Sequence, residues 1–256
     1  IKNKVLTLYF HNDPLSMNGS KKPNERIYLL NNVDKIIFNS KWSQKRFFID
    51  LPNKKLLLNK TAVCFQSSSK VKIDFKKKEK IITFIGKLNR AKGYDLFGDA
   101  IIKILNKHKN WKANVYGDEP REKLFFYHKN LNIFGFKTNE YILKSLKKTS
   151  ISVVCSRWDE PFGRTSLEAA SRGVAVIISN KGGLPETTKN AVILNTLSSK
   201  NLYKTIDNLI NDKNKLLRLQ KKNHENFIFT HKYIANIIDK LKKNLNENNI
   251  LNKINI

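Results

Sequence analysis

Residues 156–173 read SRWDEPFGRTSLEAASRG and place two carboxylates, Glu160 and Glu168, eight positions apart. The preceding run, residues 151–155 (ISVVC), is apolar at both alternating sets of positions, which is typical of a buried parallel strand. Leu167 and the alanines after it begin a helix that Gly173 ends, and a further apolar run follows. The first carboxylate therefore lies in a loop at the carboxyl end of a strand, where α/β sheets bind ligands.

The start of this helix favours an anion and a sugar side by side. Residues 162–165 (FGRT) present free backbone N–H groups, which form a seat for phosphate. Carboxylates beside that seat would repel phosphate, so we expect Glu160 and Glu168 to face sugar hydroxyls. The combination predicts a nucleotide-sugar site.

Three motifs together resemble those of retaining glycosyltransferases of the GT-B fold, family 4 in particular. Residues 156–173 resemble the family's Glu-x7-Glu motif, residues 84–93 (FIGKLNRAKG) its Gly-Arg-Leu-x3-Lys-Gly strand and loop, and residues 182–186 (GGLPE) a third motif after the next strand. They follow the family's order and spacing over about residues 81–190. The resemblance implies an enzyme, a hexosyl or related transferase, that moves a sugar from a nucleotide diphosphate sugar to an acceptor hydroxyl.

The resemblance also implies roles for single residues. Lys87 and Lys92 would neutralise the donor diphosphate, and Lys87 stands where the family has Arg, so that contact lacks a bidentate fork. Glu168 would bind the ribose hydroxyls, and Glu160 would lie beside the transferred sugar. His11 ends the first expected strand, where the family often carries a His near the donor sugar. We therefore expect Glu160, His11 and Lys92 to be catalytic.

Further contacts with the substrate are expected from backbone groups and from two loops. Gly163 lets the backbone approach the ligand because it has no Cβ, and residues 135–137 follow a strand end where family members hold the base. Glu168 could instead complement the helix dipole, and Glu186 could cap a helix. The expected substrate-binding set is Lys87, Lys92, Phe136, Glu160, Phe162, Gly163, Arg164, Thr165, Glu168, Gly183 and Glu186.

The net charge of +28, from 49 basic and 21 acidic residues, has three interpretations. The first is a coding bias, because Lys, Asn and Ile crowd even the expected surface loops. The second is peripheral contact with an anionic membrane. Nucleic acid comes last and is not expected as a partner, because the basic residues are scattered and no RNA- or DNA-binding pattern is present.

The cysteines and the acidic residues indicate the cellular compartment and whether a metal or cofactor is expected. Cys64 and Cys155 lie in apolar strand-like runs, as reduced core residues of a cytosolic protein do. The sequence has no Asp-x-Asp motif, and neither cysteine has a Cys or His at ligand spacing, so we expect no metal and no cofactor. The expected location is the cytoplasm, with peripheral attachment to the inner membrane face as a further option.

Strands that alternate with helices predict a doubly wound parallel α/β sheet. Residues 79–227 are expected to form a complete C-terminal, nucleotide-sugar-binding Rossmann-like domain of the GT-B fold. Residues 1–78 resemble the last part of an N-terminal, acceptor-side Rossmann-like domain, which suggests a fragment. Residues 228–256 are expected to supply a helix that crosses back to the N-terminal domain, followed by a polar tail. Within these domains, we expect a linker at residues 74–80 and a helix at residues 121–128.

Two alternatives to transfer stay open. One is another GT-B enzyme that processes nucleotide sugars, such as an epimerase, and the other is a non-catalytic nucleotide- or RNA-binding module. The expected setting, synthesis of cell-surface polysaccharide or lipopolysaccharide, rests on family analogy. The acceptor is expected to be a glycan or a lipid-linked sugar, and the sequence leaves the base, the sugar and the acceptor undefined.

Overall fold

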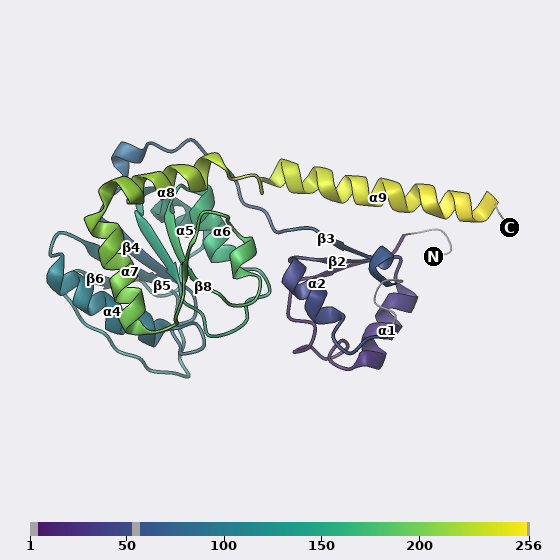
Figure 1. The fold of residues 1–256 in the computed structure, drawn as a ribbon, viewed down its shortest axis with the longest axis horizontal. Coiled ribbons are helices and arrows are strands. Elements are labelled where there is room, and N and C mark those ends of the chain that lie inside the picture. Colours follow the sequence, from purple (N-terminus) through teal and green to yellow (C-terminus); the bar gives the residue numbers. More distant parts are fainter. Residues whose placement is uncertain (1–4, 53–56, 255–256) are drawn as a thin grey trace. The chain divides into compact units, whose positions relative to one another are not determined.

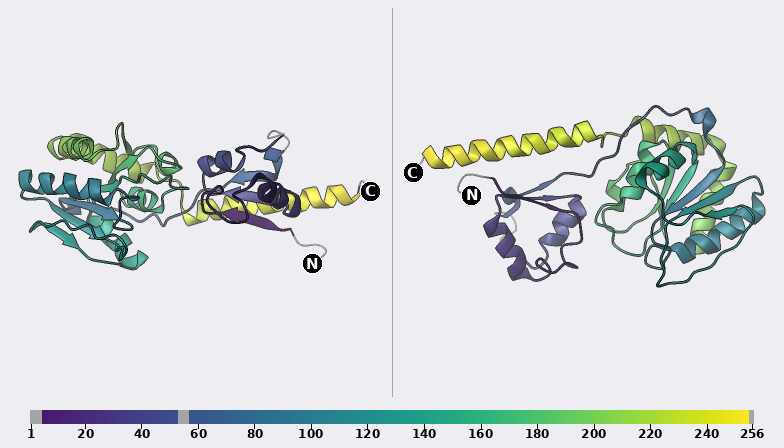
Figure 2. Two further views of the ribbon diagram at one scale, coloured as in Figure 1. Left: turned by 90° about the horizontal axis from the view of Figure 1, so that it is seen from below. Right: turned by 180° about the vertical axis from the view of Figure 1, so that it is seen from behind.

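The computed structural model describes residues 5–52 and 57–254 and divides the chain into two compact units. The first unit comprises residues 1–67 and 228–256, and the second comprises residues 68–227. Figure 1 labels helices and strands of both units where there is room, and Figure 2 gives two further views.

The first unit is built on a three-stranded parallel sheet in the order β1-β2-β3. Phe38 of β2 lies on one face with Phe10 and Phe47, and Ile37 lies on the other with Cys64. Successive strand residues face opposite sides, so the last three residues of β2, Ile36 to Phe38, are all apolar because both faces are covered. The elements of this unit are β1 (Thr7–Phe10), α1 (Pro23–Asn32), β2 (Lys35–Phe38), α2 (Lys41–Phe47), η1 (Leu58–Lys60), β3 (Thr61–Val63) and α9 (His231–Ile254).

The long helix α9 covers the second face of this sheet. Ile234 is buried with Ile37 and Cys64, and further apolar side chains of α9 at helical spacing pack against them, namely Ile237, Ile238 and Leu241. The helix continues to Ile254 and so includes most of the expected polar tail; residues 255 and 256 lie outside the described part. Within residues 5–52 and 57–254, no helix is long and apolar enough to cross a bilayer.

The second unit is a six-stranded parallel sheet in the order β6-β5-β4-β7-β8-β9. The strand order reverses between β4 and β7, which makes their carboxyl ends a topological switch point. Helices cover both faces of the sheet: α4 packs against α7, and α6 packs against α5 and α8 (Figures 1 and 2). Its elements are η2 (Phe75–Lys77), β4 (Ile81–Ile85), α4 (Tyr94–Lys107), β5 (Lys112–Tyr116), β6 (Leu131–Ile133), α5 (Asn139–Lys148), β7 (Ile151–Val154), α6 (Arg164–Ser171), β8 (Ala175–Ser179), η3 (Leu184–Glu186), β9 (Val192–Leu194), α7 (Ser199–Asn211) and α8 (Lys213–Glu225).

The core of the second unit explains its strand sequences. All five residues of β8 are buried, because helices cover both sides of this interior strand. Phe97, Ile101 and Ile104 of α4 are fully buried against this sheet, at the spacing of one helix face. The packing holds β4 and β7 side by side, and their carboxyl ends carry the loops described below.

The segment of residues 74–80 was expected to be a linker, and this expectation is wrong. Residues 74–80 belong to the second unit, where Phe75–Lys77 form a short 3-10 helix and the Lys78 ammonium is anchored to the backbone. Burial, with a contribution from Arg172, lowers the pKa of Lys78 to about 7. Its Nζ donates hydrogen bonds to three backbone carbonyls, those of Leu146, Thr149 and Arg172, at 3.1, 2.9 and 2.8 Å.

The helix expected at residues 121–128 is also absent; all of these residues are described and none is helical. Exposure alternates along the segment, and Leu124 and Phe126 pack against the core of the second unit. A spacing of two suits an extended chain, whereas one helix face would need a spacing of three or four. The period of the apolar residues therefore decides against a helix.

Candidate functional site

Two loops meet at the switch point of the second sheet. The first runs from β4 to α4, and the second runs from β7 to α6. The backbone N–H groups of Arg157 and Trp158 both donate to the carbonyl of Ala91, at 2.9 and 3.1 Å. Gly93 has a φ of +75°, and a Cβ there would overlap the carbonyl of Cys155. The loops pack so closely that this position requires glycine.

An ion pair fastens the second loop to α4. The Arg157 guanidinium contacts Asp95 through two nitrogens, with Nη1–Oδ1 at 2.6 Å and Nη2–Oδ2 at 2.7 Å. Partial burial raises the pKa of Asp95, but the Arg157 hydrogen bonds and charge outweigh this, and the pKa lies below its usual value. The bidentate geometry fixes the direction of the chain as it leaves β7.

Lys92 and Glu160, 68 positions apart, are brought into contact by these loops. The Lys92 ammonium donates to Glu160 Oε1, and the two side chains are 31% and 14% exposed. The backbone N–H of Lys92 is held in turn by Asn89 Oδ1 at 3.0 Å. The site therefore offers a positioned cation beside a positioned carboxylate, both accessible from solvent.

A cavity of about 240 Å³ lies over this pair, at the carboxyl ends of β4 and β7. The backbone at the start of α6 forms one wall, where the first N–H groups of a helix favour anions. Strand ends form the floor, and a cation and a carboxylate line the same space. Its lining residues are Phe84, Ile85, Gly86, Lys92, Val154, Ser156, Glu160, Gly163, Arg164 and Thr165.

Glu168 is buried, with 6% of its surface exposed, and is held by two neighbours. Its Oε1 accepts from Asn139 Nδ2 at 2.9 Å and from Arg164 Nη2 at 2.9 Å. Among the described residues, none donates a hydrogen bond to the second oxygen, Oε2. One carboxylate oxygen thus fixes the side chain, and the second keeps its hydrogen-bonding capacity.

A second cavity, of about 310 Å³, shares Ile85 and Gly86 with the first. It lies between the ends of β4 and β5 and the segment before α5. Phe136 presents an aromatic ring there that is 75% exposed, and Lys87 adds a cation at its rim. The full lining is Ile85, Gly86, Lys87, Tyr116, Gly117, Asp118, Phe136, Lys137 and Ile142.

The loop after β8 supports the chain at Glu160. The backbone N–H of Gly183 donates to the Glu160 carbonyl at 2.7 Å, and that of Gly182 donates to Asp159 Oδ1 at 3.2 Å. Gly182 has a φ of +58°, and a Cβ there would overlap the Glu160 backbone. Gly183 and Glu186 line neither cavity, and Phe162 is buried with 2% exposure. Substrate contacts by these three residues stay predictions.

His11 belongs to the first unit, so the second unit does not bring it together with the other expected site residues. Its Nδ1 shares a hydrogen bond of 3.1 Å with Gln66 Nε2, and the centroids of the His11 and Tyr9 rings lie 4.3 Å apart. A catalytic role for His11 stays a prediction.

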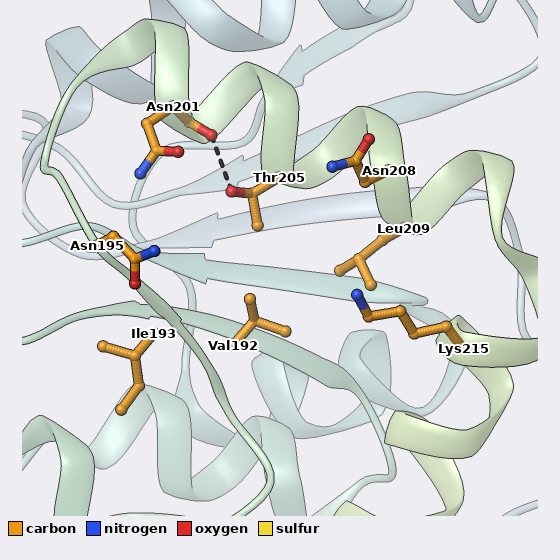
Figure 3. A pocket seen from close by; sticks show the side chains of 8 residues that line it. All are labelled: Val192, Ile193, Asn195, Asn201, Thr205, Asn208, Leu209 and Lys215. Atoms are coloured by element: carbon orange, nitrogen blue, oxygen red, sulfur yellow. Dashed lines mark hydrogen bonds between the residues drawn. The ribbon is translucent and has the colours of Figure 1, made fainter.

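A third cavity, of about 170 Å³, lies between β9 and α7 (Figure 3). The Thr205 hydroxyl donates to the Asn201 carbonyl at 2.8 Å beside it. Lys215 is the one charged residue among the described residues that line it, and no carboxylate accompanies it. This cavity lacks the pairing of cation and carboxylate found at the switch point.

Sequence reasoning missed the residues that hold the functional side chains in place. Asn139 orients Glu168 from the first turn of α5, and Asn89 holds Lys92. A lone Asn at a helix start normally indicates local capping, so no sequence signal pointed to the contact of Asn139 with Glu168. Across the described residues, no group of three His, Cys, Asp or Glu side chains is placed to hold a metal ion.

Comparison with known sequences gives a family. Residues 65–226 match the family model for glycosyl transferases group 1. Bacillus subtilis spore coat protein SA is 28% identical over 160 residues, which are 56% of this chain and 42% of that protein. Rhizobium meliloti LpsB, a lipopolysaccharide core biosynthesis mannosyltransferase, is 26% identical over 176 residues, 62% of this chain and 49% of its own. The chain spans less than half the length of these relatives.

Comparison with solved structures gives the fold. Anabaena Alr3699/HepE in complex with UDP aligns with a TM-score of 0.76 at 17% identity, over 94% of this chain and 72% of that chain. A glycosyltransferase from Rickettsia africae aligns with a TM-score of 0.74 at 18% identity, over 93% and 70%. These identities carry no more than the fold, and the expected α/β GT-B class with a Rossmann-like domain is confirmed.

Proposed function

The chain belongs to the glycosyl transferases group 1 family, and we propose that it is a retaining family 4 enzyme that transfers a hexosyl or related sugar. In this proposal, a nucleotide diphosphate sugar is the donor and the α-configuration is kept. The observation that carries it is the contact of Lys92 with Glu160 in the cavity at the switch point. Lys92 would then bind the diphosphate and Glu160 the sugar hydroxyls of one and the same donor molecule.

The diphosphate would bind where cations and free N–H groups converge. Lys92 lines the first cavity and Lys87 the second, and Gly86 lies on the wall that the cavities share. Negative charge builds on the diphosphate as the glycosidic bond breaks, so positioned cations lower the barrier. The first turn of α6, at Arg164 and Thr165, adds backbone N–H groups to the same cavity.

The nucleoside would bind toward Glu168 and Phe136. Glu168 Oε1 is taken by Asn139 and Arg164, so Oε2 is the oxygen that would accept from a ribose hydroxyl. The second cavity, with the exposed Phe136 ring on its wall, suits a planar base. The HepE structures with UDP and with UDP-glucose support a nucleotide-sugar donor of this class.

The transfer step would need no nucleophile from the protein. The acceptor hydroxyl attacks the anomeric carbon as the bond from that carbon to the diphosphate breaks. The hydroxyl proton passes to an oxygen of the departing phosphate on the same face of the sugar, and the nucleoside diphosphate leaves. In this scheme Glu160 orients the sugar while Lys92 stabilises the leaving group, so the site works by positioning and charge.

The acceptor would be a glycan or a lipid-linked sugar in the synthesis of cell-surface polysaccharide or lipopolysaccharide. The LpsB relative, whose name places it in lipopolysaccharide core synthesis, supports that setting. We place the enzyme in the cytoplasm, on the side where nucleotide sugars are made.

Thermal unfolding with UDP-, GDP- and ADP-sugars tests the proposal. A ligand that binds the folded state stabilises it by about 2.7 kcal/mol at a hundred times its dissociation constant. We expect the sugars of one of these nucleotides to raise the midpoint of thermal unfolding. The Lys92→Ala substitution should abolish that shift. No shift with any nucleotide sugar, together with a shift from single-stranded oligonucleotides, would favour the non-catalytic binding module instead.

A further inference from the structure

The segment between β5 and β6 has an exposed side that the donor site does not use. From residue 121 to residue 129, every odd-numbered side chain is exposed and every even-numbered one is partly buried. Phe125 and Tyr127 are 85% and 90% exposed. These are the highest values among the exposed large hydrophobic residues of the described chain. Two neighbouring aromatic rings therefore stand in water at the surface of the second unit.

The inward residues hold this exposed side in place. Leu124 and Phe126 pack against the core, and the Phe126 ring meets Tyr94 edge-on with centroids 5.5 Å apart. Glu122 Oε1 accepts from Arg90 Nη1 at 3.0 Å. Because neighbouring side chains on an extended chain point opposite ways, the inward-facing Phe126 directs Phe125 and Tyr127 outward.

The charges on the exposed side are positive. Arg121 is paired with Glu119, at 2.7 Å from Nε to Oε1. Lys123 and Lys129 flank the two rings, and among the residues the structure describes neither forms an ion pair with a carboxylate. Glu122, the acidic residue within the segment, is paired with Arg90, and the chain carries a net charge of +28, so the two rings lie between lysines that no carboxylate neutralises.

We propose that residues 121–129, the aromatic-basic segment, dock on an anionic lipid bilayer. The Phe125 and Tyr127 rings enter the interface between head groups and acyl chains, which aromatic side chains favour. Lys123 and Lys129 contact anionic head groups, whose surface potential attracts basic residues. Docking removes two exposed rings from water and gives both lysines a counter-charge.

A lipid surface fits this segment better than a nucleic acid does. Proteins that bind single strands combine stacking rings with a charged groove that follows the backbone. The cavities described above are lined by residues outside 121–129. A protruding pair of rings between two lysines suits a broad, soft surface.

Vesicle flotation of the 256-residue chain tests the proposal. We expect binding to phosphatidylcholine vesicles that contain phosphatidylglycerol, and little binding to phosphatidylcholine alone. The Phe125→Ser/Tyr127→Ser variant should lose roughly tenfold or more in affinity, because insertion of apolar surface drives interfacial binding. Tyr28→Ser, which removes another exposed ring, is the matched control and should bind as wild type does. Equal binding by wild type and the double variant would overturn the proposal.

A second pair of measurements locates the contact. Lys123→Glu/Lys129→Glu should abolish the preference for phosphatidylglycerol while the thermal midpoint stays unchanged. Cys64 and Cys155 are buried, so a Phe125→Cys variant can be labelled at that position with an environment-sensitive dye. We expect its emission to shift to the blue on anionic vesicles. An unshifted emission would overturn the proposal. The proposal would also fail if the Phe125→Ser/Tyr127→Ser variant lost binding to single-stranded RNA but still bound vesicles as wild type does.

Discussion

At the residue scale, the candidate site depends on which charges meet. Lys92 and Glu160 come from separate loops, and each is also held through its backbone, Lys92 by Asn89 and Glu160 by Gly183. Their side-chain contact keeps the ammonium at the cavity before any ligand arrives. An incoming diphosphate would compete with Glu160 for that ammonium, which links donor binding to release of the carboxylate toward the sugar.

Replacement of Lys92 tests the charge on the leaving group. Lys92→Ala should lower kcat/KM by about 100-fold, a typical loss for a group that stabilises charge in the transition state, and Lys92→Arg should lose far less. Release of nucleoside diphosphate from the donor gives the rate. Lys103→Ala, an exposed lysine on α4, is the control and should turn over as wild type does. Equal rates for the two Lys92 variants would remove the diphosphate role.

Replacement of Glu168 tests the nucleoside contact. Glu168→Ala should weaken the binding of a nucleotide diphosphate sugar at least tenfold, since losing hydrogen bonds to a charged group costs roughly 1.5–3 kcal/mol. Isothermal titration measures the affinity. Glu140→Ala removes an exposed carboxylate from α5 and should leave affinity unchanged. If Glu168→Ala binds as tightly as wild type, Glu168 does not touch the donor.

At the element scale, the site is a product of loop packing. The β7–α6 loop is tied to the β4–α4 loop at Ala91, to α4 at Asp95, and to the loop after β8 at Glu160. These anchors explain the motifs found in the sequence, because Gly93 and Gly182 lie where two backbones touch. The motif glycines thus shape the loops, and the charged residues between them line the cavity.

The sequence predicted some elements well and others poorly, for physical reasons. The run from 151 to 155 and the helix after it were predicted because both are buried and bounded by clear end signals. The segment 121–128 was assigned to a helix, but the spacing of Leu124 and Phe126 fits an extended chain. The contact of Asn139 with Glu168 could not be predicted, since it depends on how α5 packs against α6.

The ion pair of Asp95 with Arg157 should make stability depend on pH in a defined direction. The folded pKa of Asp95 is lowered, so the pair stabilises fully above the unfolded pKa of about 3.9 and is lost as pH falls through the folded pKa. Arg157→Met should cost less than about 1 kcal/mol near neutral pH, because the pair is partly exposed. The difference in urea unfolding should be largest at neutral pH and should shrink as the pH falls below the unfolded pKa. Arg218→Met is the control, and a cost that stays undiminished in acid would contradict the ion-pair account.

At the scale of the whole molecule, the chain forms two units with separate cores. The family match covers residues 65–226, which includes nearly all of the second unit, and the candidate site lies there. The first unit depends on α9, which comes from the other end of the chain and buries Ile234 against the three-stranded sheet. A small sheet with few strands gains its second covered face in this way.

Truncation of Ile234 tests that dependence. Ile234→Ala should destabilise the first unit by about 2–4 kcal/mol, because it leaves a cavity beside Ile37 and Cys64. Hydrogen exchange should become faster at β2 and stay unchanged at β8 in the second unit. Tyr233→Ala, at an exposed position on the same helix, should change neither. Equal acceleration in β2 and β8 would mean that the units do not unfold separately.

The location of the donor is the central claim, and hydrogen exchange with and without a stabilising nucleotide sugar tests it most directly. The account predicts slower exchange in residues 86–93, 135–139 and 156–168, with no change in residues 192–215 around the cavity of Figure 3. Protection of residues 192–215 with the switch-point loops unaltered would contradict the account.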